Sequence, residues 1–233
     1  MEETRTVLTF DHVTGKKGKF RLKDISLSLQ AGYIYGLAGK NGAGKTTLMK
    51  YILEEHCRYE GKIYLDGEDI SSDHARTMNK AGYVSEDNSF FEERTGVQNA
   101  EILGSLYDDF SMERFREAMK TMEMTGTKAY KRMSRGERLK FQLAFAIAHS
   151  PRLYLLDEAT AGMDPVFRRE LFDMLRHLIK DGQCTVLMTS HIRSEIEEKT
   201  DYVAVMEDGA LGTFVESLDF AKSMEQTDVR SHI

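Results

Sequence analysis

The residues best suited to chemistry in this chain form a glycine-rich loop. The loop consists of Gly39, Lys40, Asn41, Gly42, Ala43, Gly44, Lys45, Thr46 and Thr47. It fits the pattern G-x-x-x-x-G-K-[ST], in which glycines let backbone N–H groups turn toward phosphate oxygens. The lysine can then reach the β- and γ-phosphates, and the Thr46 hydroxyl can ligate Mg²⁺. The loop therefore predicts a binding site for a nucleoside triphosphate.

The segments on both sides of this loop agree with that interpretation. Residues 33–38 before it suit a buried strand, and residues 46–53 after it carry apolar side chains at helical spacing. A strand, a glycine loop and a helix follow one another where triphosphates bind, because the N-terminus of the helix adds a favourable partial charge. An incidental glycine-rich turn is the alternative, and it does not explain both flanks.

Two carboxylates follow an apolar strand further along the chain. Residues 153–156 are apolar, and Asp157 and Glu158 come directly after them. Asp157 is suited to bind Mg²⁺ opposite Thr46, and Glu158 is suited to polarise an attacking water. An Asp-Glu pair at a strand end can also cap a helix or lie on the surface. Its place downstream of a phosphate-binding loop favours the catalytic interpretation.

Strands and helices alternate along the chain, which predicts an α/β fold. The segments expected to form strands are 6–10, 25–29, 33–38, 61–65, 81–85, 153–158, 183–189, 201–207 and 210–214. Helices are expected at 46–53, 139–148 and about 165–180, the last with Asp164 as N-cap. We predict a mostly parallel sheet flanked by helices, with an antiparallel β subdomain at the N-terminus. Ligands bind at the carboxyl ends of the strands in such sheets, where the loop and both carboxylates fall.

Between residues 87 and about 132 the composition becomes polar, rich in Glu, Met and Phe and poor in β-branched residues. Four apolar residues in this stretch recur at the spacing of one helix face, and a stripe of this kind is typical of a core. These residues are Phe115, Ala118, Met119 and Met122. We interpret the stretch as a small helical insertion within a single domain of residues 1–233.

Composition narrows the class of protein further. The chain has 233 residues and a formal net charge of −6, so no overall basic surface favours nucleic acid as a partner. The first residues lack the apolar segment of a signal peptide, and no apolar run is long enough to cross a bilayer. Cys57 and Cys184 have neither metal-site nor redox spacing and are expected to be reduced thiols. We expect a cytosolic protein, or one held at a membrane only through a partner.

Taken together, these segments resemble the ATP-binding subunits of ABC transporters over nearly the whole chain. Residues 39–46 resemble the Walker A loop, and residues 153–158 resemble Walker B with its adjacent glutamate. Residues 133–137 resemble the LSGGQ segment, residues 161–164 the D-loop, and His191 the switch histidine. The order and spacing of all five match the family.

The resemblance implies a P-loop NTPase fold and an ATPase shared between two copies. ATP and Mg²⁺ are the implied cofactors, and a second copy or a paralogous ATP-binding subunit is an implied partner. On this resemblance, two copies are expected to close head to tail, so that each ATP lies on the phosphate loop of one copy and under Ser134 and Gly136 of the other. Glu158 is expected to activate water, His191 to contact the γ-phosphate, and Asp164 to link the two sites.

Several positions depart from the family pattern. Glu86 stands where the family usually has glutamine, and a carboxylate there can still ligate Mg²⁺ while adding negative charge. Thr46, Asp157 and Glu86 are therefore the expected metal ligands. Arg135 replaces the first glycine of the LSGGQ segment. Glu137 replaces its final glutamine, and locally it completes a capping box with Ser134 at the start of an apolar helix.

No aromatic residue stands near Lys16, where the family stacks one on adenine. Phe20 is the nearest candidate, although it can equally be a buried strand residue. The basic loop at residues 15–19 is open to two interpretations, as a solvated hairpin turn or as a wall of the nucleotide site.

A single short domain of this kind resembles subunits paired with separately encoded permeases. We therefore expect the energy-coupling ATPase of a transporter, with export as its direction, in the cytoplasm at the inner face of the membrane and bound there through an integral-membrane permease. Phe90 and Phe91, in the predicted insertion, are candidates for the permease contact, or else they belong to a small satellite core. A soluble ABC-type ATPase acting in assembly or translation is the alternative. A non-hydrolysing nucleotide sensor is disfavoured by the presence of Glu158 and His191.

Overall fold

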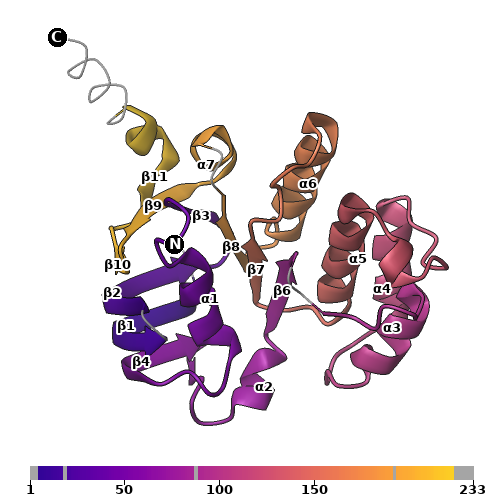
Figure 1. The fold of residues 1–233 in the computed structure, drawn as a ribbon, viewed down its shortest axis with the longest axis horizontal. Helices are drawn as coiled ribbons and strands as arrows, with labels where there is room; N and C mark the ends of the chain where they lie inside the picture. Colours follow the sequence, from indigo (N-terminus) through magenta and orange to yellow (C-terminus); the bar gives the residue numbers. More distant parts are fainter. Residues whose placement is uncertain (1–4, 18–19, 87–88, 191–192, 223–233) are drawn as a thin grey trace.

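Two β-sheets organise the computed structural model, which describes residues 5–17, 20–86, 89–190 and 193–222 (Figure 1). The first sheet is antiparallel and contains, in order, β2 (Phe20–Gln30), β1 (Thr6–Lys17), β4 (Tyr59–Leu65) and β5 (Glu68–Asp69). The second contains, in order, β10 (Ala210–Leu211), β9 (Tyr202–Glu207), β3 (Ile34–Ala38), β8 (Thr185–Thr189), β7 (Leu153–Asp157) and β6 (Ala81–Ser85). The strands from β9 to β6 run parallel, whereas β10 and β11 (Val215–Glu216) pair antiparallel with β9. The mostly parallel sheet and the antiparallel N-terminal sheet are both as predicted.

Helices cover the two faces of the parallel sheet. Helix α1 (Lys45–Leu53) packs on one face, between that sheet and the antiparallel sheet. Helices α5 (Arg135–Ala148) and α6 (Pro165–Leu178) pack on the other face. The remaining helices are α2 (His74–Met78), α3 (Gly96–Gly104), α4 (Met112–Thr121), the 3₁₀ turn η1 (Tyr130–Arg132) and α7 (Arg193–Lys199).

The apolar run of β7 shows why a parallel sheet forms. Leu153 and Leu155 pack on the α1 side, whereas Tyr154 and Leu156 pack on the α5 side. Successive side chains of a strand point to opposite faces, so a strand covered on both faces must be apolar throughout. The alternation therefore divides the core into two clusters, one on each side of the sheet.

Local signals begin the long helices where the sequence predicts. The Ser134 hydroxyl accepts a hydrogen bond from Glu137 N at 3.2 Å, and Glu137 Oε2 accepts one from Ser134 N at 2.7 Å. This is a complete capping box for α5. Asp164 caps α6 through the backbone N–H groups of Val166 and Phe167, and Pro165 occupies the first turn. Such caps depend only on neighbouring residues, which is why they are predictable.

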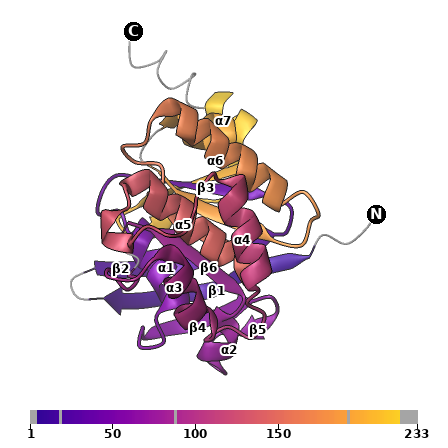
Figure 2. The ribbon, with the colours of Figure 1, turned by 90° about the vertical axis from the view of Figure 1, so that its right-hand side faces the viewer.

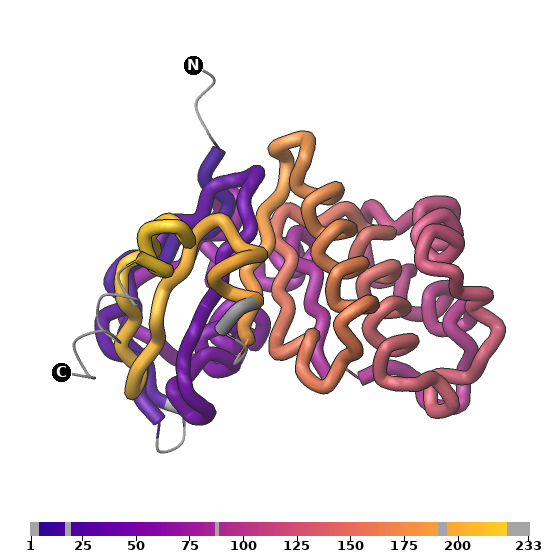
Figure 3. The backbone as a smooth tube through the Cα atoms, turned by 90° about the horizontal axis from the view of Figure 1, so that it is seen from above, coloured from indigo at the N-terminus to yellow at the C-terminus, as the bar shows by residue number. Residues whose placement is uncertain are grey.

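The helices α3 and α4, which fall within the predicted insertion, pack against α5 at one end of the molecule (Figures 2 and 3). The four residues of the predicted stripe are all buried there. The Phe90 ring lies 4.8 Å from the Phe141 ring and 5.4 Å from the Phe145 ring, between centroids. Phe91, by contrast, is 48% exposed. The two neighbouring aromatics therefore differ: Phe90 belongs to the core of this end, and Phe91 lies on its surface.

Some features differ from the expectation or extend it. Strand β1 continues to Lys17 and pairs Lys17 with Phe20, so residues 15–17 of the basic loop belong to paired strands, and residues 18–19 lie outside the described chain. The short helices α2 and α7 were not expected. No helix in the described segments is long and apolar enough to cross a bilayer.

Asn99 fixes the backbone of the segment that carries Phe91. This fully buried amide accepts a hydrogen bond from Phe91 N at 2.8 Å and donates to the carbonyls of Phe91 at 3.1 Å and Thr95 at 3.1 Å. We expect Asn99→Ala to lower the free energy of unfolding by roughly 1–3 kcal/mol, because buried backbone groups lose their partners. Urea unfolding measures the effect, with the exposed Glu101→Ala on the same helix as control. Equal stability of the two variants would show that this segment does not depend on Asn99.

Candidate nucleotide site

The phosphate loop joins the carboxyl end of β3 to α1. Gly42 and Gly44 adopt φ values of 83° and 115°, which favour glycine. Within the described chain no side chain caps α1, so the N–H groups of its first turn are free to meet an anion. The Lys45 side chain is only 4% exposed, and its Nζ donates to the carbonyl of Gly39 at 2.7 Å. The loop thus surrounds the buried Lys45 ammonium group with backbone carbonyls.

Strand register brings the other candidate residues to the same edge. Leu37 of β3 lies opposite Thr189 of β8, and Thr189 lies opposite Asp157 of β7. Asp157 in turn lies opposite Ser85 of β6. Because these parallel strands end together, the residues that follow them emerge side by side, at the edge where ligands bind in α/β sheets.

Thr189 holds Asp157 in place. Its hydroxyl donates to Asp157 Oδ1 at 2.7 Å and accepts from Glu158 N at 2.9 Å. Thr189 is fully buried and Asp157 is 6% exposed. Sequence reasoning missed Thr189; the only local signal is a hydroxyl residue at the end of an apolar strand, directly before Ser190.

Glu158 stands where the chain leaves the sheet. It adopts a φ of 48°, which is uncommon for a residue with a side chain, and its N–H is fixed by Thr189. Its Oε1 lies 3.6 Å from Lys45 Nζ. A carboxylate beside the lysine of the phosphate loop is suitably placed to act on a group bound to that loop.

The residues at this edge fit a divalent cation. Thr46 makes no side-chain hydrogen bond to the described part of the chain, and Asp157 uses one carboxylate oxygen on Thr189. Mg²⁺ takes oxygen ligands from one or two carboxylates, hydroxyls and phosphates. Thr46 and Asp157 therefore supply the donor set that the sequence predicts.

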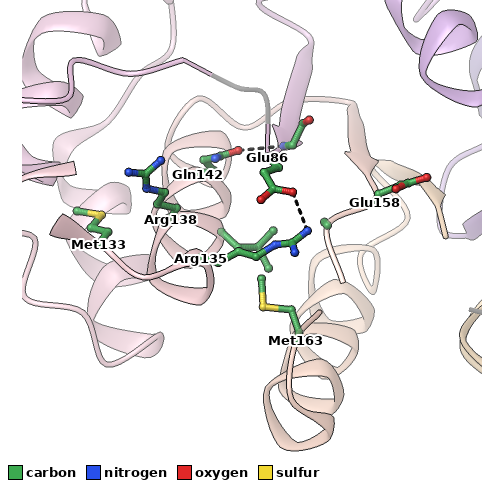
Figure 4. A pocket seen from close by; sticks show the side chains of 10 residues that line it. Glu86, Met133, Arg135, Arg138, Gln142, Glu158 and Met163 are labelled. Atoms are coloured by element: carbon green, nitrogen blue, oxygen red, sulfur yellow. Dashed lines mark hydrogen bonds and ion pairs between the residues drawn. The ribbon is translucent and has the colours of Figure 1, made fainter. Parts of the chain in front are cut away.

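Glu86 occupies the same edge but already has a partner. Its Oε2 lies 2.8 Å from an Arg135 guanidinium nitrogen, and the two side chains are 67% and 40% exposed. Both line a cavity of about 180 Å³ that also reaches Glu158, Gln142 and Met163 (Figure 4). Glu86 thus remains a predicted metal ligand, with a competing interaction that the sequence does not reveal.

Three further candidates lie at helix N-termini away from the phosphate loop. Ser134 and Gly136 begin α5, and Asp164 caps α6; α5 and α1 pack on opposite faces of the sheet. The cavity that Arg135 lines includes no residue of the loop. The Ser134 N–H group and Lys128 hold the pKa of Glu137 below its usual range, with the Lys128 hydrogen bond as the larger cause. His191, the remaining predicted residue, lies outside the described residues.

Phe20 contacts the phosphate loop directly. A side-chain carbon built on Gly44 would overlap the Phe20 ring and approach the Met206 methyl group. The ring is only partly buried. Phe20 therefore packs on the loop and also keeps an accessible surface beside it. Both interpretations, a packed strand residue and a stacking surface for adenine, are compatible with this position.

Comparison with known proteins agrees with this geometry. The model of a family described as ABC transporter matches residues 22–161. The ABC transporter ATP-binding protein YtrB of Bacillus subtilis (strain 168) is 33% identical over 201 residues, which cover 86% of this chain and 68% of that protein. The bacitracin transport ATP-binding protein BcrA of Enterococcus faecalis is 32% identical over 208 residues, covering 88% and 68%.

Solved structures show the same fold. The ATP-binding subunit of an ABC transporter matches with a TM-score of 0.83 at 21% identity, covering 94% of each chain. The structure of cbiO1 from Clostridium perfringens matches with a TM-score of 0.79 at 22% identity. Because the family model matches more than half of the chain and two relatives exceed 30% identity, the chain belongs to the ABC transporter family, among its ATP-binding subunits.

Proposed function

We propose that this chain hydrolyses ATP with Mg²⁺ and drives a transporter whose membrane-spanning permease is a separate polypeptide. The observation that supports hydrolysis is the buried Lys45 ammonium, 3.6 Å from the Glu158 carboxylate at the edge where Asp157 ends its strand. A phosphate-binding cation, a metal-binding carboxylate and a candidate base meet there. Together they suit in-line attack of water on a phosphate bound by the loop.

The residues take distinct roles in this proposal. Lys45 and the N–H groups at the start of α1 bind the phosphates. Thr46 and Asp157, with Glu86, would hold Mg²⁺, which neutralises phosphate charge when bound. Glu158 accepts a proton from the attacking water.

Completion of the site by a second copy is part of the proposal. Ser134 and Asp164 are exposed, and Gly136 is partly exposed, with the Met163 sulfur beside it. The N-terminus of α5 offers a favourable partial charge to a phosphate. Since these residues lie away from the loop of their own chain, we propose that they face the ATP of a partner subunit, identical or paralogous.

The permease contact is proposed for the surface around Phe91. Phe91, Ile102 and Leu106 are 48%, 44% and 73% exposed, and Leu106 borders a cavity of about 320 Å³ that Phe90 also lines. Large apolar side chains exposed in this way are suited to a protein interaction site. A permease bound there would hold this subunit at the inner face of the membrane. We propose export as the direction, as the resemblance to subunits paired with separately encoded permeases implies.

Glu158→Gln tests the hydrolysis. We expect it to bind ATP, to lose roughly 10²–10⁴-fold in turnover because the base is removed, and to accumulate as an ATP-bound dimer. A steady-state ATPase assay and gel filtration with ATP measure these effects, and Glu101→Gln, an exposed carboxylate in α3, serves as control. Turnover of Glu158→Gln at the parent rate would contradict the proposed role of Glu158 as the base.

Glu86 and Arg135 should shift the Mg²⁺ requirement in opposite directions. Glu86→Gln removes a negative charge from the metal site, so we expect half-maximal ATPase activity at roughly two- to fivefold higher Mg²⁺. Arg135→Gln removes the competing cation and should lower the requirement by a similar factor, in line with about 1 kcal/mol for an exposed pair.

In the Glu86→Gln background the Arg135 change should have no further effect. Arg138→Gln is the control, because Arg138 lines the same cavity but pairs with Glu92 at 3.5 Å. An unchanged Mg²⁺ titration in Glu86→Gln would place Glu86 outside the metal shell.

Phe91→Ala tests the permease contact. We expect loss of permease-stimulated ATPase and of transport in vesicles containing the permease, with basal ATPase unchanged, because the ring is exposed and distant from the loop. Val215→Ala, an exposed change in β11, is the control. A collapsed thermal transition in Phe91→Ala would instead identify the ring as part of the core.

A further inference from the structure

Glu195, in the first turn of α7, is a buried charge that the proposed site leaves without a role. Among the described residues, the charged side chains less than 9% exposed are Lys45, Asp157 and Glu195. The first two belong to the phosphate loop and the metal-binding edge. Glu195 is 3% exposed and belongs to neither.

Both oxygens of the Glu195 carboxylate are engaged. Oε2 accepts hydrogen bonds from the hydroxyls of Thr160 and Ser190, each at 2.6 Å. Oε1 lies 2.7 Å from Nε of Arg168 in α6. The three partners come from the segment after β7, the segment after β8, and α6.

These contacts fix the segment that begins with Glu158. Ala161 N donates to the Glu158 carbonyl at 3.1 Å, and Met163 N donates to the Thr160 carbonyl at 3.1 Å. Arg168 also donates to the Met163 carbonyl at 3.0 Å. The segment is thus held at Glu158 N by Thr189 and at Thr160 by Glu195.

A buried carboxylate usually adds little to the free energy of unfolding. Removing it from water costs several kcal/mol, and well-packed apolar residues are often as stabilising or more so. The carboxylate instead supplies directed contacts: two hydroxyl hydrogen bonds and one ion pair hold three segments at set distances, which an apolar side chain does not do.

We propose that Glu195 is a positioning residue for ATP hydrolysis. Through Thr160 it sets the place of Glu158, and through Ser190 it ties that segment to the end of β8. The inference rests on the proposed ATPase activity. The partners of Glu195 lie outside the phosphate loop, and the network meets that loop at the pair of Glu158 and Lys45, so Glu195 acts on turnover and not on ATP binding.

Glu195→Gln tests the role. The amide keeps the shape but places an N–H₂ group against either the Arg168 guanidinium, which can only donate, or the two hydroxyls, which would have to turn their O–H groups toward other acceptors. Displacement of a reacting group by about 1 Å costs on the order of 10²-fold. We expect kcat to fall roughly 10- to 100-fold, with the Kd for ATP changed less than about threefold.

Two further variants sharpen the test. Glu198→Gln changes an exposed carboxylate of the same helix and should leave kcat unchanged. Thr160→Val removes one hydroxyl and leaves the Arg168–Glu195 pair, so it should lower kcat in the same direction even if Glu195→Gln fails to fold.

A double variant separates positioning from general destabilisation. If Glu195 acts through Glu158, Glu195→Gln should cause no further loss in a Glu158→Gln background, measured by single-turnover hydrolysis. Normal kcat in both Glu195→Gln and Thr160→Val, a matching loss of ATP affinity, or an additive loss in the double variant would overturn the inference. Failure of the parent protein to hydrolyse Mg-ATP would instead contradict the proposed function.

Discussion

Parallel pairing of β3, β8, β7 and β6 is the constraint on which the proposed site depends. Leu37, Thr189, Asp157 and Ser85 lie opposite one another across these strands, so the strands end together. A slip of one residue would turn the apolar side chains of a strand to the wrong face. Because the core forbids such a slip on both faces, the packing that stabilises the sheet also places Asp157 and Glu158 beside the phosphate loop.

The charged groups at this edge are held by few but well-directed contacts. Lys45 is bound by loop carbonyls, Asp157 by Thr189, and Glu195 by two hydroxyls and Arg168. A buried charge needs such partners, since its loss of hydration is otherwise uncompensated. The Lys45 ammonium is bound within its own loop, whereas the partners of Asp157 and Glu195 come from other segments of the chain. The site therefore forms only when the sheet has assembled.

Two departures from the family pattern meet in space. Glu86 adds a negative charge after β6, and Arg135 adds a positive charge at the start of α5, where they form an ion pair. Nearby, Gln142 of α5 accepts a hydrogen bond from Ser85 N at 2.9 Å. These contacts join the helical end of the molecule to the edge of the sheet. A movement of α5 relative to the sheet would therefore have to alter the surroundings of Glu86.

Features that depend on neighbouring residues could be predicted from the sequence. The phosphate loop, the capping box of α5, the Asp-Pro start of α6 and the apolar strands all follow from local spacing and conformational preference. The α/β class and the edge at which ligands bind follow from the alternation of strands and helices. The short helices α2 and α7 were missed because they carry too few residues for a periodic signal.

Contacts between side chains far apart in the sequence could not be predicted and became visible in the folded chain. The contacts of Thr189 with Asp157, of Arg135 with Glu86, and of Thr160 with Glu195 depend on register and packing between segments, which no local pattern encodes. The same holds for Phe90 and Phe91, adjacent residues of one type that the fold divides between core and surface. Burial is set by the elements that pack on a residue, and composition alone does not say which elements those are.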